Sequence, residues 1–285
     1  MHTRRIGDVE VSAIGLGAMP MSIEGRPDEE RSLATVHAAL DAGVTLIDTA
    51  DAYHLHADEV GHNETLVAKA LASHDRGGEV LVATKGGHLR PGDGSWTLDG
   101  SPRHLKEACE ASLRRLGVEA IGLYQFHRPD PKVPYAESVG AVRELLDEGK
   151  IRMAGISNAN PEQIRQAQDI LGGRLVSVQN QFSPAFRSSE PELRLCDELG
   201  IAFLPWSPLG GIAKAGELGS AHGAFARIAE QHGVSPQRVC LAWMLAKSPV
   251  VVPIPGASRP ETIRDSAAAP DLVLTDTELA ELDAA

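Results

Sequence analysis

The sequence predicts an α/β protein that is one (β/α)8 barrel domain over residues 1–285, preceded by a short N-terminal β-hairpin. Short apolar runs alternate with segments that have helical caps and a periodicity of 3.6 residues, which indicates a parallel sheet. Eight such alternations in a chain of 285 residues fit a barrel that closes on itself. The sequence contains no low-complexity linker, so we expect no domain boundary.

The expected strands are the short apolar runs. Residues 2–13 are predicted to form the hairpin, because apolar positions flank the turn signal Gly7-Asp8. The eight expected barrel strands are 14–19, 45–49, 80–84, 121–126, 152–156, 176–179, 202–205 and 250–254.

Capping signals mark the helices between these runs. An N-cap residue followed by proline at the first helical position occurs at Ser101-Pro102, Asn160-Pro161 and Ser235-Pro236. Capping-box spacing is found for Ser258 with Glu261 and for Thr275 with Glu278. Glycines expected just after helix C-termini are Gly43, Gly149, Gly172 and Gly200.

An open, doubly wound sheet is the competing fold. It would normally carry a GxGxxG turn after its first strand. The sequence has Gly15-Leu16-Gly17 there but lacks the third glycine. The barrel is therefore the favoured prediction.

The net charge of −12 argues against sequence-independent nucleic-acid binding, which requires lysines and arginines to neutralise phosphates. An anionic ligand would need local donors. The sequence has no apolar run of the ~20 residues that span a bilayer, and its start, MHTRRIGDVEVS, has no signal-peptide core. We expect no membrane association.

The three cysteines, Cys109, Cys196 and Cys240, are far apart and fall on apolar faces of expected helices. Neither a disulfide framework nor a zinc site is indicated. We expect buried thiols and a reducing, cytoplasmic environment.

The strand ends carry the chemistry. In a barrel the active site lies at the carboxyl ends of the strands. The second strand ends in Asp48, with Tyr53 in the following loop, and the next two end in Lys85 and His127. The later ends carry Ser157-Asn158, Gln179, Trp206-Ser207 and Gly256.

The first four of these residues form a coherent chemical set. A tyrosine hydroxyl has a pKa near 10, and we expect the neighbouring ammonium of Lys85 to lower it. Asp48 would hold Lys85 in place, and His127 would orient a substrate carbonyl. Such a set would donate a proton to a carbonyl oxygen.

The motifs DTADAY, ATKGG, QFHRPD, GISN, VQNQFS, PWSPLG and IPGAS resemble those of the aldo-keto reductase superfamily, and of its short bacterial-type members. The resemblance runs from Gly15 to about Ser266. It implies a (β/α)8 barrel that prefers NADPH and a catalytic tetrad of Asp48, Tyr53, Lys85 and His127. In the implied reaction a cofactor hydride attacks the carbonyl carbon and Tyr53 protonates the oxygen.

The same resemblance implies a set of cofactor-binding residues. Those at the nicotinamide are Ser157, Asn158 and Gln179 on the carboxamide and Trp206 against the ring. Those along the pyrophosphate and adenosine are Ser207, Leu209, Gly211, Gly256, Ala257, Ser258, Arg259, Asp265 and Ser266.

The adenosine end departs from the family pattern. Gly256 stands where many members have lysine, and Thr262 where many have arginine. Arg259 could supply the missing charge, because its guanidinium suits phosphate. We expect NADP(H) to be preferred, with NAD(H) as the alternative.

Met19, His54 and Trp96 are the expected substrate-pocket residues. Trp96 lies in a glycine-rich loop that could serve as a flap. His54, His56 and His62 form a cluster that could suggest a metal, but no cysteine or paired carboxylate completes a site, so we expect an active-site loop and no metal. Because the sequence ends soon after the expected final helix, we expect an open site.

The sequence thus predicts an enzyme that reduces an aldehyde or ketone with NAD(P)H (EC 1.1.1 type). A nicotinamide-nucleotide-binding regulatory module, similar to potassium-channel β-subunits, is the alternative. A metal-dependent hydrolase would leave Asn158, Gln179 and Trp206 unexplained. The expected partner is a small-molecule carbonyl compound. The physiological substrate, the direction of the reaction and the oligomeric state remain open.

Overall fold

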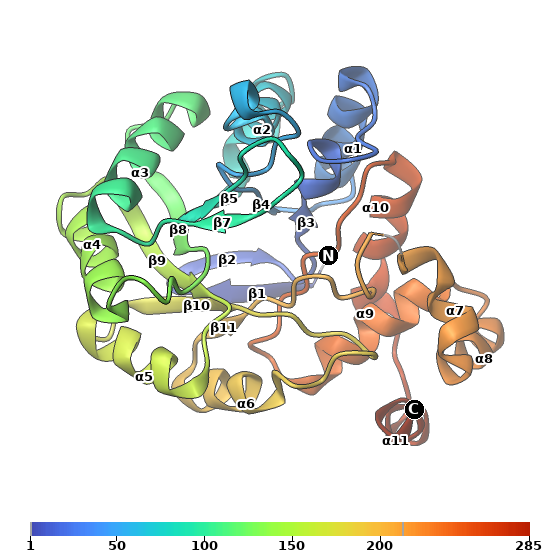
Figure 1. Cartoon of the computed structure of the whole chain (residues 1–285). Helices are drawn as coiled ribbons and strands as arrows, with labels where there is room; N and C mark the ends of the chain where they lie inside the picture. The colour runs from blue at the N-terminus through green and yellow to red at the C-terminus, as the bar shows by residue number, and fades with distance from the viewer. Residues whose placement is uncertain (1, 213) are drawn as a thin grey trace.

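Seven parallel strands form one curved sheet at the centre of the molecule (Figure 1). The computed structural model describes residues 2–212 and 214–285. The strand order is β11-β10-β9-β8-β5-β4-β3. The strands are β3 (Leu16–Gly17), β4 (Leu46–Asp48), β5 (Leu81–Gly86), β8 (Ile121–Phe126), β9 (Ile151–Ser157), β10 (Leu175–Gln179) and β11 (Ala202–Phe203).

The segment 250–256 lies between the two edges of this sheet. Val251 forms a parallel bridge with Phe203 of β11, and Gly256 forms one with Gly17 of β3. The expected strand 250–254 is therefore present only as bridges. Pro253 and Pro255 have no N–H to donate, which prevents a continuous ladder.

Helices surround the sheet (Figure 1). They are α1 (Glu29–Asp41), α2 (His62–Ala72), α3 (Pro102–Leu116), α4 (Tyr135–Asp147), α5 (Pro161–Ile170), α6 (Glu190–Leu199), α7 (Leu218–Ala221), α8 (Gly223–His232), α9 (Pro236–Lys247), α10 (Pro260–Ala267) and α11 (Asp276–Ala284). Short 3-10 helices are η1 (Met19–Met21), η2 (Ala57–Glu59), η3 (Gly77–Glu79), η4 (Ala215–Glu217) and η5 (Ala269–Asp271).

The helix starts follow the capping signals with one exception. The side chains of Ser101, Asn160, Ser235 and Thr275 each accept a hydrogen bond from a backbone N–H in the first turn. Ser258 was expected to do the same and does not, because α10 begins at Pro260 with Arg259 at the N-cap. Proline favours the first helical position, so it sets the start one residue later.

Two antiparallel hairpins accompany the sheet. β1 (Thr3–Ile6) pairs with β2 (Val9–Ser12), with Ile6 opposite Val9 across the Gly7-Asp8 turn. β6 (His88–Leu89) pairs with β7 (Thr97–Leu98), and the sequence pattern did not reveal this second hairpin. It follows β5 directly, so it stands at the end of the sheet where the strands deliver their polar residues.

Alternate strand residues separate the core into an inner and an outer part. Leu46, Leu123 and Val252 belong to an inner cluster that also contains Ile6 and Val11 of the first hairpin. Neighbouring residues such as Ile47 pack toward the helices instead. The hairpin therefore fills one end of the sheet, and the carboxyl ends of the strands remain for a site.

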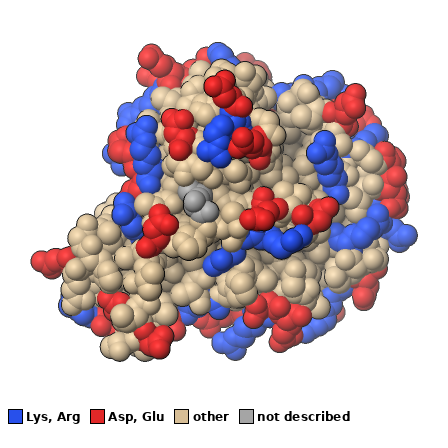
Figure 2. Space-filling view, turned by 180° about the vertical axis from the view of Figure 1, so that it is seen from behind, with Lys and Arg blue, Asp and Glu red and all other residues tan. Residues whose placement is uncertain are grey.

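All three cysteines are buried, and burial raises the pKa of Cys109 and of Cys196 to about 12. Within the described residues, no helix is long and apolar enough to cross a bilayer. Acidic and basic side chains are interspersed over the face turned away from the viewer of Figure 1 (Figure 2).

Candidate active site

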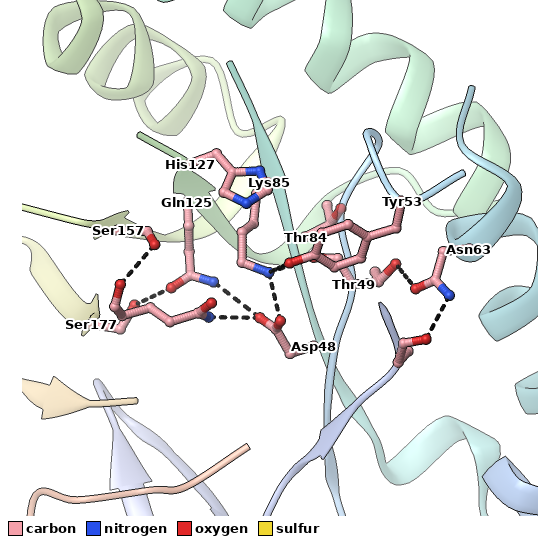
Figure 3. Close-up of polar contacts among 12 residues, drawn as sticks. Asp48, Thr49, Tyr53, Asn63, Thr84, Lys85, Gln125, His127, Ser157 and Ser177 are labelled. Atoms are coloured by element: carbon pink, nitrogen blue, oxygen red, sulfur yellow. Dashed lines mark hydrogen bonds and ion pairs between the residues drawn. The ribbon is translucent and has the colours of Figure 1, made fainter. Parts of the chain in front are cut away.

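Lys85 joins Asp48 and Tyr53 at the carboxyl ends of β4 and β5 (Figure 3). Its Nζ lies 2.5 Å from Asp48 Oδ1, 2.8 Å from the carbonyl oxygen of Thr49 and 3.2 Å from Tyr53 Oη. Lys85 and Asp48 are buried. A buried ion pair with all its donors satisfied is held in one geometry, so the ammonium is fixed beside the phenol.

The second carboxylate oxygen of Asp48 is held by two glutamines. Gln179 Nε2 donates to Asp48 Oδ2 at 2.7 Å, and Gln125 Nε2 donates to it at 3.4 Å. Ser177 Oγ donates to Gln125 Oε1 at 3.3 Å (Figure 3). Sequence reasoning placed Gln179 only at the cofactor and missed Gln125, although its position two residues before His127 places it on the same face of β8.

The pKa of Tyr53 is set by two opposing effects, burial and the charge of Lys85. Burial raises the pKa of Tyr53, and the ammonium of Lys85 opposes this shift without offsetting it. Burial acts to lower the pKa of Lys85, but Asp48 and Tyr53 together more than compensate and the net shift is upward. Lys85 therefore lowers the Tyr53 pKa as expected, but burial, which the sequence does not reveal, outweighs it and the net shift is upward. At neutral pH the pair is phenol and ammonium, which is the form a proton donor needs.

His127 follows β8 and faces the same place. Its ring lies edge-on to that of Tyr53, with centroids 5.8 Å apart. Burial, assisted by the charge of Lys85, holds the pKa of His127 well below its usual value. Its Nδ1 is buried and has no hydrogen-bond partner among the described residues. A neutral imidazole can donate one hydrogen bond to a carbonyl oxygen.

A cavity of about 440 Å³ opens over Asp48, Tyr53 and His127. The size is that of a site for a small molecule or for part of a cofactor. The sequence-predicted residues that also line it are Met19, Trp96, Ser157, Asn158, Gln179, Trp206, Ser207, Leu209, Gly211 and Gly256.

The remaining predicted adenosine-end residues, Ala257, Ser258, Arg259, Asp265 and Ser266, lie outside the cavity lining. Asp265 was expected at the adenine. Its carboxylate instead lies 2.6 Å from Arg238 Nη2 and also accepts from Ser235, both near the start of α9. Arg259 is exposed, with its Nε 3.8 Å from Glu261.

His54 does not line the cavity. It is buried, and its Nδ1 lies 2.7 Å from the carbonyl oxygen of His56. The expectation that it lines the substrate pocket is wrong, because the loop turns this ring inward. His62 pairs instead with Ser22 at 2.8 Å. Among the described residues, no three metal-ligating side chains converge.

Two titratable residues of the cavity lining, His88 and Arg128, were not predicted from the sequence. The ring of His88 in β6 lies between those of Trp96 and His127, tilted against the first and edge-on to the second, with ring centroids 4.7 Å and 4.9 Å away. Arg128 donates from Nη2 to Asn158 Oδ1 at 3.1 Å. Both follow predicted strand ends, in ATKGGH and QFHRPD, so their position was the available signal.

Backbone strain is concentrated at the same cavity. Among the described residues, Asn158 and Ser207 are the non-glycine residues with positive φ, at 58° and 50°. Both line the cavity. Such conformations cost free energy and cluster at functional sites. Asn158 is held there because it accepts from Trp206 Nε1 at 3.2 Å and donates to the His127 carbonyl oxygen at 3.0 Å.

The strand ends of this α/β sheet bring a phenol, an ammonium, a carboxylate and a neutral imidazole to one cavity. This fold and this site are those of an oxidoreductase that acts on carbonyl groups. The sequence profile of the Aldo/keto reductase family matches residues 13–285, and the chain belongs to this family.

Relatives and solved structures agree with this membership. An uncharacterized oxidoreductase of Schizosaccharomyces pombe is 36% identical over 99% of this chain and 89% of its own length. A probable aldo-keto reductase of Glycine max is 33% identical over 96% of this chain and 85% of its own length.

Two solved structures cover 99% of this chain and 94% of their own chains at 29% identity. They are the glycerol dehydrogenase of Gluconobacter oxydans, with a TM-score of 0.84, and an aldo/keto reductase of Klebsiella pneumoniae in complex with NADP and acetate, with a TM-score of 0.82.

Proposed function

We propose that this protein reduces an aldehyde or ketone to an alcohol with NAD(P)H, and that Tyr53 is the proton donor. The observation that carries the proposal is the contact of Lys85 Nζ with both Asp48 Oδ1 and Tyr53 Oη at the cavity. The family membership supports the same chemistry. The regulatory-module alternative is not favoured, because the relatives are oxidoreductases.

The residues present fit a nicotinamide cofactor. Gln179 donates a hydrogen bond from Nε2 to Asp48. Its amide oxygen can accept a hydrogen bond from a carboxamide in the cavity. Trp206 offers an indole on the same lining. Asn158 Nδ2 donates a hydrogen bond to Ser157 Oγ at 3.0 Å, and both residues line the same side of the cavity. When bound, the cofactor supplies the hydride.

The chain's own groups supply the proton and the orientation. His127 donates a hydrogen bond to the carbonyl oxygen of the substrate and directs it toward Tyr53. Tyr53 then transfers its proton to the developing alkoxide. Lys85 stabilises the phenolate that remains, at 3.2 Å, and Asp48 keeps Lys85 charged. Positioning by rigid strand ends contributes further to the rate.

Changing Tyr53 to Phe tests the proton donor. We expect kcat/KM for aldehydes to fall by about 10²- to 10⁴-fold, because the substitution removes the phenolic proton that neutralises the developing alkoxide. The dissociation constant of NADPH should stay the same. Loss of NADPH absorbance with a panel of aldehydes gives the rates, and fluorescence titration gives the cofactor affinity.

Tyr135→Phe is the matched control, because Tyr135 is a half-buried tyrosine outside the cavity lining. It should retain wild-type kcat/KM. Equal rates for Tyr53→Phe and the wild type would contradict the proposed role.

We further propose that NADP(H) is the preferred cofactor. Two solved structures from Klebsiella pneumoniae contain NADP or NADPH, and both are similar to this chain. Arg259 is exposed just after the cavity residue Gly256 and can reach a 2′-phosphate.

Arg259→Ala should raise the dissociation constant of NADPH about tenfold, as expected for an exposed charge-assisted contact, and leave that of NADH unchanged. Isothermal titration of both cofactors measures this. An unchanged NADPH affinity would remove Arg259 from the phosphate site.

We also propose that residues 250–256 act as the eighth strand of one (β/α)8 barrel domain over residues 1–285. The bridges to Phe203 and Gly17 support this closure.

A further inference from the structure

We propose that Arg128 binds an anionic group of the substrate, and that the substrate class is a carbonyl compound bearing a carboxylate. The inference rests on the proposed reductase function and names the substrate class of the same site. It starts from the charges of the cavity wall. Of the described residues that line the cavity, Arg128 is the one lysine or arginine and Asp48 the one acid.

Asp48 is already neutralised by Lys85, whose Nζ lies 2.5 Å from its Oδ1. The Arg128 charge is not compensated in this way. No carboxylate of the described residues lies within ion-pair distance of its guanidinium. Its hydrogen-bond acceptor is the neutral amide oxygen of Asn158. The cavity therefore carries a net positive charge inside a protein of net charge −12.

This cation is partly withdrawn from water. Arg128 is half-buried, and burial lowers its pKa. Burial, with the charges of Lys85 and Arg128, lowers the pKa of His127, and burial, with the charge of Arg128, lowers that of His88, so both rings face the guanidinium as neutral groups. A guanidinium has five donors, and a partly desolvated charge without a counter-ion is costly. An incoming anion would recover that cost.

Arg90, in the same region, is an arginine whose charge is paired within the protein. Its guanidinium pairs with Glu24, donates to the His54 carbonyl oxygen at 2.6 Å and lies 4.9 Å from the Trp96 ring. These contacts engage the guanidinium of Arg90 and fix the loop that carries Trp96. Arg128 has no such set of partners among the described residues, and its place on the cavity wall gives a ligand access to it.

The guanidinium fork matches two oxygens of a carboxylate or of a phosphate in one plane. Of these two anions, the singly charged carboxylate matches the single charge of Arg128. Other parts of the wall are apolar, with Met19, Pro20, Trp96 and Ile212. The geometry suits an apolar or aromatic carbonyl compound that ends in a carboxylate.

The experiment compares two aldehydes of the same shape, 4-carboxybenzaldehyde and its neutral methyl ester, with NADPH. The wild type should show a higher kcat/KM for the acid. In Arg128→Gln, which keeps an amide donor for Asn158, kcat/KM for the acid should fall about 10- to 100-fold, the size of a lost charge-assisted contact. The change should lie mainly in KM. The ester should stay within about threefold.

Arg152→Gln is the matched control, because Arg152 is exposed on β9 and carries the same charge change. It should leave both substrates unchanged. Equal losses of acid and ester in Arg128→Gln, or a weakened NADPH affinity, would assign Arg128 to the support of Asn158 and overturn the proposal.

A third arm compares glyceraldehyde 3-phosphate with glyceraldehyde. A preference for the phosphate alone would overturn the carboxylate assignment. Turnover of the neutral ester by the wild type reports on the reductase function itself, so failure of one proposal is distinguishable from failure of the other.

Discussion

At the scale of single residues, the protonation states of the site side chains depend on burial and on neighbouring charges. Tyr53 has a raised pKa because it is buried, and Lys85 keeps its charge because Asp48 and Tyr53 together offset the same burial. The phenol of Tyr53 and the ammonium of Lys85 therefore lie side by side as a proton donor and the cation that stabilises its phenolate. His88 belongs to this scale as well, since it is the aromatic spacer between Trp96 and His127.

His88 should make stability depend on pH. Burial, with the nearby charge of Arg128, lowers the pKa of His88 to about 4, whereas an unfolded histidine titrates near 6.5. Between these values the unfolded state binds more protons, so stability falls as the pH falls. Urea unfolding at several pH values should show this decline below about pH 6.5.

His88→Phe keeps an aromatic ring in the stack and cannot bind a proton. We expect a shallower decline of its unfolding free energy between the two pKa values. The same slope in the variant and the wild type would show that other groups, such as His127, account for all of it.

At the scale of elements, one buried side chain ties three segments together. Asn63 at the start of α2 accepts from Thr49 Oγ1 at 2.6 Å (Figure 3). It donates to the Ala18 carbonyl oxygen at 2.8 Å and to Ser22 Oγ at 2.7 Å. It therefore links the loops after β3 and β4 to a helix. The loop after β4 carries Tyr53, so this link helps to place the proton donor.

Asn63→Leu should destabilise the protein by about 2–4 kcal/mol, because three buried polar groups lose their partner. Chemical denaturation measures the change. Asn160→Ala, which removes an exposed helix cap from α5, is the comparison and should cost about 1 kcal/mol. A loss for Asn63→Leu no greater than that of the cap variant would contradict the role of this network.

At the scale of the whole molecule, the two ends of the sheet have different tasks. Ile6 and Val11 of the first hairpin join the inner core at one end, and the strand ends open into the cavity at the other. The chain is acidic as a whole, while Arg128 at its cavity has no carboxylate partner in the part of the chain that the structure describes. An anionic substrate is thus drawn by a local charge and not by the surface as a whole.

Local patterns in the sequence determined much of this protein. Periodicity gave β8 with its bounds, and caps gave the starts of α3, α5, α9 and α11, because these signals depend on residues close in the chain. Order along the chain also predicted that Asp48, Tyr53, Lys85 and His127 lie together, since parallel strands deliver their carboxyl ends to one place. The motif resemblance gave the family that the comparisons confirm.

The tertiary structure decided what depends on contacts between distant segments. It turned His54 inward, bound Asp265 to Arg238 and brought Gln125 and Gln179 onto Asp48. It also set the direction of the Tyr53 pKa, which depends on burial and charge together. Neither burial nor electrostatic environment can be predicted from one short stretch of sequence. Both arise when strands that are far apart in the chain pack side by side.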